Sequence, residues 1–182
     1  DADLDNVYEV TVRATDGALI DSQDLSVTVT AVNDINPVIT SNGGGATGSI
    51  SVAENTTAVT TVAATDADLP AQTLTYSIAG GADQALFSID GATGVLSFIA
   101  APDFEAPADA DLDNVYEVTV QASDGTLIDS QDLSVTVTAV NDVNPVITSN
   151  GGGATASISI AENTTAVTTV TATDADLPAQ TL

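Results

Sequence analysis

The sequence predicts an all-β protein in which seven-stranded Greek-key β-sandwich domains follow one another in a linear array. Three observations support this: a domain-sized repeat, an alternation of apolar and polar residues, and turn motifs at regular intervals. Segments 1–74 and 109–182 are nearly the same sequence, and the run DADLDNVYEV returns after 108 positions. A period of this length is that of a whole domain, not of a small solenoid unit.

The two copies are so similar that they divide the chain without ambiguity. Their differences are mild: Arg13/Gln121, Thr15/Ser123, Ala18/Thr126, Ile35/Val143, Gly48/Ala156, Val52/Ile160 and Ala63/Thr171. We assign 1–33 to the last two strands of one repeat, 34–141 to a complete repeat, and 142–182 to the first two strands of the next. Because the sequence starts and stops within a repeat, we expect a window of a longer polymer, whose continuation orders the partial repeats.

Strands in the complete repeat are expected where apolar and polar residues alternate with a period of two. In 115–123, for example, Tyr116, Val118 and Val120 would face inward and Glu117 outward. The expected strands are 48–53, 58–64, 73–78, 85–89, 95–100, 115–123 and 131–140. Glycine clusters and Asp-Gly pairs separate these segments, and no segment has a sustained helical period.

The charge balance excludes several classes of partner. The chain has 26 acidic residues and a single basic one, Arg13, for a formal charge of −25. Nucleic acid and anionic membrane surfaces would therefore be repelled. With 43% hydrophobic residues the chain can still build a core. Such an acidic but foldable chain either tolerates its self-repulsion or neutralises it with bound cations.

Residue types that are missing narrow the chemistry further. The chain has no Cys and no His, which excludes disulfides and makes zinc and haem sites improbable. It has no Lys, so Schiff-base chemistry is excluded as well. No apolar run approaches the roughly 18 residues of a membrane span. Carboxylate, amide and carbonyl oxygens remain, and these are ligands for a hard cation.

Strand parity predicts where the acidic motifs gather. With seven antiparallel strands, the incoming and outgoing linkers lie at opposite ends of the domain, which we call the top and the base. Expected at the base are Glu54, Asp103, Glu105, Asp109, Asp111, Asp113, Asn141, Asp142 and Asn144. Expected at the top are Asn33, Asp34, Asn36, Asp66, Asp68 and Asp124, with Asp174 and Asp176 at the top of the next repeat. The base of one repeat therefore faces the top of the next.

Facing carboxylates suit calcium, which takes six to eight oxygens at roughly 2.3–2.6 Å in flexible geometry. Magnesium demands stricter octahedral geometry and is the weaker candidate. Bound cations would neutralise the junction and lock two domains at a fixed angle. The alternative for the same residues is a solvated acidic surface.

The run 109–114, DADLDN, has its own alternatives. Alternating Asp at its first, third and fifth positions is how calcium loops present oxygens. The run lacks the glycine and the distal glutamate of an EF-hand, and it leads into a strand rather than a helix. An added calcium site and a solvated acidic turn both remain open.

These motifs together resemble those of a bacterial cadherin domain, over the whole repeat. The base glutamate matches Glu54 in AEN, the Asp-x-Glu motif matches Asp103-Phe104-Glu105, and the Asp-x-Asp motif matches 66–68 and 174–176. Asp124 matches the aspartate between the last two strands, and the linkers read VNDINP and VNDVNP. Ala139 and Val143 depart from the family's linker, so the resemblance implies two ions per junction rather than three. It further implies an Ig-like sandwich fold and a calcium-rigidified extracellular repeat.

The first functional interpretation is a non-enzymatic segment of a bacterial cell-surface adhesin, stalk, filament or biofilm matrix protein. Its expected partners are Ca²⁺, neighbouring repeats and other copies of the chain. The second is a polysaccharide-binding or homotypic adhesion module, although the few aromatics lie mostly at inward positions. An enzyme is the poorest interpretation, because the Asp103/Glu105 pair is expected at a junction rather than in a cleft.

Overall fold

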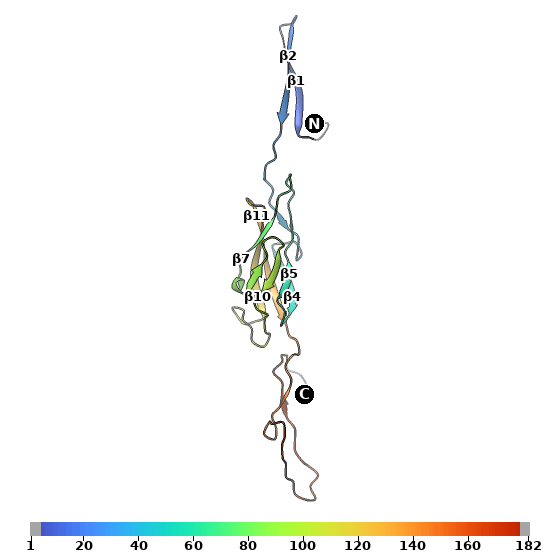
Figure 1. Cartoon of the computed structure of the whole chain (residues 1–182), viewed down its shortest axis with the longest axis vertical. Coiled ribbons are helices and arrows are strands. Elements are labelled where there is room, and N and C mark those ends of the chain that lie inside the picture. The colour runs from blue at the N-terminus through green and yellow to red at the C-terminus, as the bar shows by residue number, and fades with distance from the viewer. Residues whose placement is uncertain (1–4, 179–182) are drawn as a thin grey trace.

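The computed structural model describes residues 5–178, and this part of the chain is built of strands with a single 3₁₀ turn. Figure 1 shows three parts along one long axis: a hairpin at the N-terminal end, a sandwich in the middle and an extended segment at the C-terminal end. The hairpin pairs β1 (Val7–Thr15) with β2 (Ile20–Thr28). The predicted all-β sandwich class is confirmed.

The sandwich consists of two sheets formed within 34–141. The first sheet has the order β4 (Thr47–Ala53), β11 (Ile128–Thr138), β10 (Val115–Ser123) and β7 (Thr75–Gly80). The second has the order β5 (Ala58–Thr61), β9 (Val95–Phe98) and β8 (Phe87–Ile89). All pairs are antiparallel except β4 with β11, which is parallel. β4, from the start of the domain, is therefore an edge strand of the first sheet and lies beside β11, the last strand of the domain.

Two short strands extend this arrangement at the top of the domain. β3 (Val38–Ile39) pairs antiparallel with β6 (Ala64–Thr65). β3 and β4 are thus two halves of one strand that changes sheets, and β5 and β6 are two halves of another. Counted this way, the domain has the seven expected strands, in a Greek-key arrangement.

The expected strand positions are close to those observed, and 115–123 coincides with β10. The expected strand 58–64 is interrupted because the Val62 N–H donates to the Gly94 carbonyl at 2.8 Å. Gly94 has φ +71°, and a Cβ there would lie 2.1 Å from the Val62 oxygen, so only glycine permits this approach. The expected strand 85–89 begins with the 3₁₀ turn η1 (Gln84–Leu86), and β3 was not expected.

The core lies between the two sheets. Its buried apolar residues are Ile39, Val62, Phe87, Leu96, Phe98, Tyr116, Val118, Val120, Ala122, Leu133, Val135 and Val137. Phe87 and Phe98 stack at 4.5 Å, and Tyr116 meets Phe98 edge-on at 5.1 Å between ring centroids. The predicted inward positions of β10 are all buried. This core fixes the loops at both ends of the domain.

The C-terminal segment repeats the top of the domain. β12 (Val146–Ile147) pairs antiparallel with β13 (Ala172–Thr173), as β3 pairs with β6. Residues 154–171, which correspond to the β4 and β5 region, form no strand. None of the described residues belongs to a helix of the length and apolar character that a membrane crossing needs.

Candidate metal centres at the two junctions

Glu54 is the central group of the junction at the base of the sandwich. It directly follows β4 and is only 2% exposed. Its Oε1 accepts a hydrogen bond from the Val140 N–H at 2.6 Å, and its Oε2 accepts one from the Phe104 N–H at 2.8 Å. One buried carboxylate therefore ties together the end of β4, the loop after β9 and the outgoing linker. Burying a carboxylate requires such compensation.

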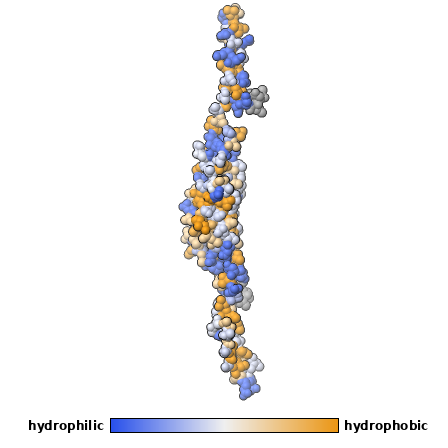
Figure 2. Space-filling model, in the orientation of Figure 1, coloured by the Kyte–Doolittle hydropathy of each residue, from blue (hydrophilic) through white to orange (hydrophobic). Residues whose placement is uncertain are grey.

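Glu105 and Asp142 bring two further carboxylates to Glu54. Oxygens of the three groups lie within 4.8 Å of one another. Glu105 is half-buried and Asp142 is exposed. A divalent cation among these three carboxylates would be held by oxygens from the end of β4, the loop after β9 and the linker. Figure 2 shows hydrophilic residues gathered at this end of the sandwich.

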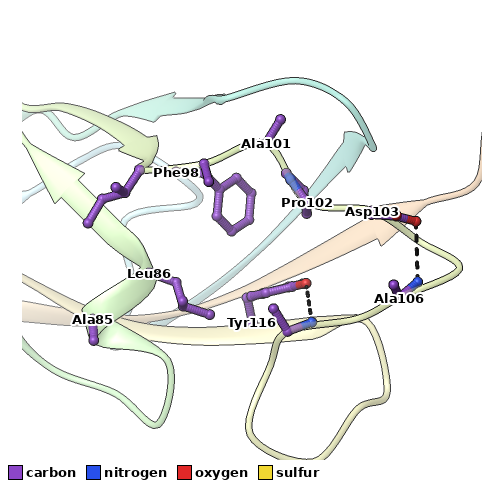
Figure 3. Close-up of a pocket in the computed structure, with 11 residues that line it drawn as sticks. Ala85, Leu86, Phe98, Ala101, Pro102, Asp103, Ala106 and Tyr116 are labelled. Atoms are coloured by element: carbon purple, nitrogen blue, oxygen red, sulfur yellow. Dashed lines mark hydrogen bonds between the residues drawn. The ribbon is translucent and has the colours of Figure 1, made fainter.

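Asp103 shapes the loop that carries Glu105. Its Oδ1 accepts hydrogen bonds from the N–H groups of Glu105 at 3.0 Å and Ala106 at 3.2 Å. Behind this loop lies an apolar pocket of about 230 Å³, lined among others by Leu86, Phe98 and Tyr116 (Figure 3). Asp103 and Tyr116 are the ionisable residues of its lining.

The following segment meets the base through its own acidic motif. Asp176 is 1% exposed, and its Oδ1 accepts hydrogen bonds from the linker N–H groups of Asp142 at 3.4 Å and Val143 at 3.1 Å. Half-buried Asp174 accepts the Asp176 N–H at 3.0 Å. The Leu177 N–H donates to Glu105 Oε1 at 2.9 Å, so the two repeats touch directly. The remaining candidates, Asn141 and Asn144, are exposed on the linker.

The junction at the top of the sandwich has the same design. Asp68 is 7% exposed, and its Oδ2 accepts hydrogen bonds from the N–H groups of Asp34 at 3.2 Å and Ile35 at 3.0 Å. Asp66 accepts the Asp68 N–H at 2.8 Å. The linker amide of Asn36 donates to the Ile128 carbonyl at 3.2 Å, so this side chain fastens the linker to β11.

Three buried oxygens of this top junction have no hydrogen-bond donor. They are Asn33 Oδ1, Asp66 Oδ2 and Asp124 Oδ2. Buried acceptors are nearly always satisfied, and carboxylate and amide oxygens are the ligands that calcium prefers. The backbone N–H of Leu127, followed by that of Thr126, holds the pKa of Asp124 below its ordinary value, which keeps this carboxylate charged. The donor set therefore fits a hard divalent cation.

The 109–114 loop is organised by its own carboxylates. Asp109, 2% exposed, accepts the N–H groups of Asp113 at 2.7 Å and Asn114 at 3.3 Å. Oxygens of Asp109, Asp111 and Asp113 lie within 4.8 Å of one another, and the Asp113 charge raises the pKa of Asp111. The hydrogen bonds are those of an acidic turn, and the spacing is compatible with a cation.

Two polar residues with structural roles, Asp83 and Asn55, were not among the predicted site residues. Asp83 is 4% exposed and accepts N–H groups from Ala110 at 2.8 Å and Glu117 at 2.9 Å, which ties the 109–114 loop to β10. Burial, and then the neighbouring Asp83, raises the pKa of Glu117. Asn55 donates from Nδ2 to Asp142 Oδ2 at 2.6 Å. Its place directly after Glu54 was the one available signal.

The fold is a seven-stranded β-sandwich with acidic side chains gathered where its two linkers join it. The sequence profile of the cadherin domain family matches residues 48–140, and the chain belongs to this family. Cadherin domains are extracellular adhesion modules, and the family binds calcium at junctions between domains.

Similar proteins agree with this assignment. Protocadherin Fat 1 of Homo sapiens is 33% identical over 98% of this chain and 4% of its own length. Cadherin-16 of Oryctolagus cuniculus is 36% identical over 85% of this chain and 19% of its own length. The cis-dimer structure of protocadherin gammaB7 superposes with a TM-score of 0.64 at 28% identity, covering 97% of this chain and 45% of that one. The chain thus spans a small part of these curated relatives.

Proposed function

We propose that this chain is a calcium-rigidified spacer, a repeat segment of a bacterial extracellular adhesin stalk or filament. The observation that carries the proposal is the set of three donorless buried oxygens, on Asn33, Asp66 and Asp124, at the top junction. They come from the incoming linker and two separate loops of the sandwich. A cation bound among them would fasten the linker to the domain.

The physical effect of the cation is to replace repulsion by attraction at each junction. Glu54, Glu105 and Asp142 would otherwise hold three charges within 4.8 Å. Extracellular modules commonly bind calcium with Kd values of ~0.1–1 mM, so the rod would be stiff outside the cell and slack where calcium is scarce. Near-identical repeats suit a spacer, whose useful property is length.

We assign about two ions to each junction. Candidate ligands at the base are Glu54, Asp103, Glu105, Asn141, Asp142, Asn144, Asp174 and Asp176, and at the top Asn33, Asp34, Asn36, Asp66, Asp68 and Asp124. Asp109, Asp111 and Asp113 are candidates for an additional site. Asn36 has the least support, because its amide faces the Ile128 carbonyl.

Calorimetry and small-angle scattering test the proposal. Calcium should raise the melting temperature and lengthen the particle relative to a chelator, with magnesium less effective. Asp124→Asn should weaken the calcium response, because it removes one of the donorless ligands. Asp16→Asn is the matched control: Asp16 accepts the N–H groups of Ala18 at 2.9 Å and Leu19 at 2.8 Å in an equivalent turn.

Identical melting and scattering curves with calcium and with chelator would refute the spacer mechanism and favour an acidic solvated surface. A polysaccharide-binding role has less support. Within the complete repeat, the aromatic rings of Phe87, Phe98 and Tyr116 are buried in the core, and Tyr76 and Phe104 pack partly buried against it, which leaves little stacking surface for a sugar.

A further inference from the structure

Asn55 touches all three parts of the base junction. It adjoins Glu54 in the chain, and its backbone N–H donates to the Pro102 carbonyl at 2.9 Å, next to Asp103. Its Nδ2 donates to Asp142 Oδ2 at 2.6 Å. The residue has φ +63°, a left-handed conformation that Asn tolerates better than most residues. One side chain therefore links the end of β4 to the outgoing linker.

We infer that Asn55 is a positioning residue, which holds the Asp142 carboxylate in place to receive the cation; this rests on the proposed function. Glu54 is already fixed by two backbone N–H groups, and Asp103 by two more. Asp142 is exposed on a linker, and the Asn55 amide is what orients its carboxylate. A neutral amide directs one oxygen and leaves the negative charge for the ion.

The chain contains an internal reference for this role. Asn163 lies in the same AENTT sequence and has φ +64°. Thr164 Oγ1 donates to the Ala161 carbonyl at 2.7 Å, as Thr56 Oγ1 does to the Ala53 carbonyl at 2.7 Å. Within the described residues, however, the Asn163 side chain forms no hydrogen bond. The position that would correspond to Asp142 for Asn163 is 250, outside the given sequence, so Asn163 shows that the turn forms without a linker partner.

The test is a calcium titration of the full chain followed by amide NMR. Signals of Phe104 and Val140 report on the base, since both N–H groups donate to Glu54, and signals of Asp34 and Ile35 report on the top. The variants are Asn55→Gly, Asn163→Gly, Asp142→Asn and the Asn55→Gly/Asp142→Asn double variant. Glycine keeps the left-handed conformation and removes only the amide.

Asn55→Gly should raise the calcium concentration needed at the base by roughly 10-fold or more, as expected for a group that orients a metal ligand. In Asn55→Gly, the calcium titration of the top signals and the melting temperature in chelator should match those of wild type. Asn163→Gly should leave the calcium titration at the base unchanged. In the Asp142→Asn background the further effect of Asn55→Gly should shrink to less than about 2-fold, because the two residues act through one contact.

Two results would overturn the inference while leaving the proposed function intact. One is an unchanged base titration in Asn55→Gly, when wild type responds normally. The other is a double variant in which the fold-increases in calcium concentration of Asn55→Gly and Asp142→Asn multiply fully. That result would mean that the two residues act independently. If neither junction of the wild-type chain responds to calcium, the spacer proposal fails and the positioning role fails with it.

Discussion

The hairpins β1–β2 and β10–β11 have nearly the same sequence but very different surroundings. Their registers correspond: Val7 faces Thr28 in one, and Val115 faces Thr136 in the other. Yet Tyr8 is 46% exposed, whereas its counterpart Tyr116 is 1% exposed beneath the second sheet. The hairpin is therefore specified by local alternation and turn chemistry, whereas burial depends on a partner sheet.

The two copies of the β4 sequence, unlike the two hairpins, differ in secondary structure. In the complete repeat, 47–53 is a strand that pairs in parallel with β11. The near-identical 155–161 forms no strand. No turn can bring a parallel partner alongside, so this pairing requires distant residues to be held together first. Strand formation here depends on the assembled domain rather than on local preference.

The largest expected effect comes from replacing the two corresponding tyrosines, Tyr116 and Tyr8, one at a time. Tyr116→Ala should lower the free energy of unfolding by about 3–5 kcal/mol, because it empties a buried site beside Phe98. Tyr8→Ala should cost less than about 1 kcal/mol, since only cross-strand contacts are lost. Urea unfolding followed by circular dichroism measures both. Equal losses would mean that the N-terminal hairpin is covered in solution.

A second pair of corresponding residues, Gln131 and Gln23, compares a buried side-chain amide with an exposed one. Gln131 is 0% exposed and donates from Nε2 to the Gly45 carbonyl at 2.8 Å. Gln131→Ala should destabilise by about 1–3 kcal/mol, because it leaves that acceptor without its donor. Exposed Gln23→Ala should change stability by less than about 0.5 kcal/mol. The same urea experiment decides, and a neutral Gln131→Ala would show that water replaces the amide.

A third pair should show no difference. Thr119 Oγ1 donates to Asp132 Oδ1 at 2.6 Å, and Thr11 Oγ1 donates to Asp24 Oδ1 at 2.6 Å, both on exposed faces. Asp132→Ala and Asp24→Ala should each cost about 0.5–1 kcal/mol of local opening free energy. Amide hydrogen exchange across each hairpin measures this. A clearly larger effect in one hairpin would show that these cross-strand bonds depend on the surrounding domain.

The smallest expected effect is a difference between the pKa values of two corresponding turn aspartates, Asp16 and Asp124, when calcium is added. Backbone N–H groups, first those of Leu19 and Leu127, lower the pKa values of Asp16 and Asp124 from the ordinary 3.8. Each ionised turn therefore stabilises the fold above the unfolded pKa, and this contribution is lost as pH falls through the lowered folded value. In NMR titrations, calcium should lower the Asp124 pKa further and leave that of Asp16 unchanged. An Asp124 pKa insensitive to calcium would exclude this carboxylate as a ligand.

Much of the candidate site could be predicted because its motifs lie at fixed positions relative to predictable strands. Parity alone grouped Glu54 with Glu105 and Asp142, and the structure brings these residues together. The roles of individual side chains were less predictable. Asn36 has its amide on the Ile128 carbonyl, and Asp83 is buried by a loop whose path the pattern did not indicate. Such contacts depend on loop geometry, which has no periodicity.

By itself, the sequence determined the features that need only neighbouring residues: the two hairpins and their registers, the Asp-Gly turns, and the left-handed asparagines at 55 and 163. Tertiary structure alone decided whether 47–53 becomes a strand, which copy of the tyrosine is buried, and that Asn55 reaches Asp142. The reason is physical: hydrogen bonds within a turn or hairpin form over short loops, whereas parallel pairing and a shared core require distant segments to be assembled together.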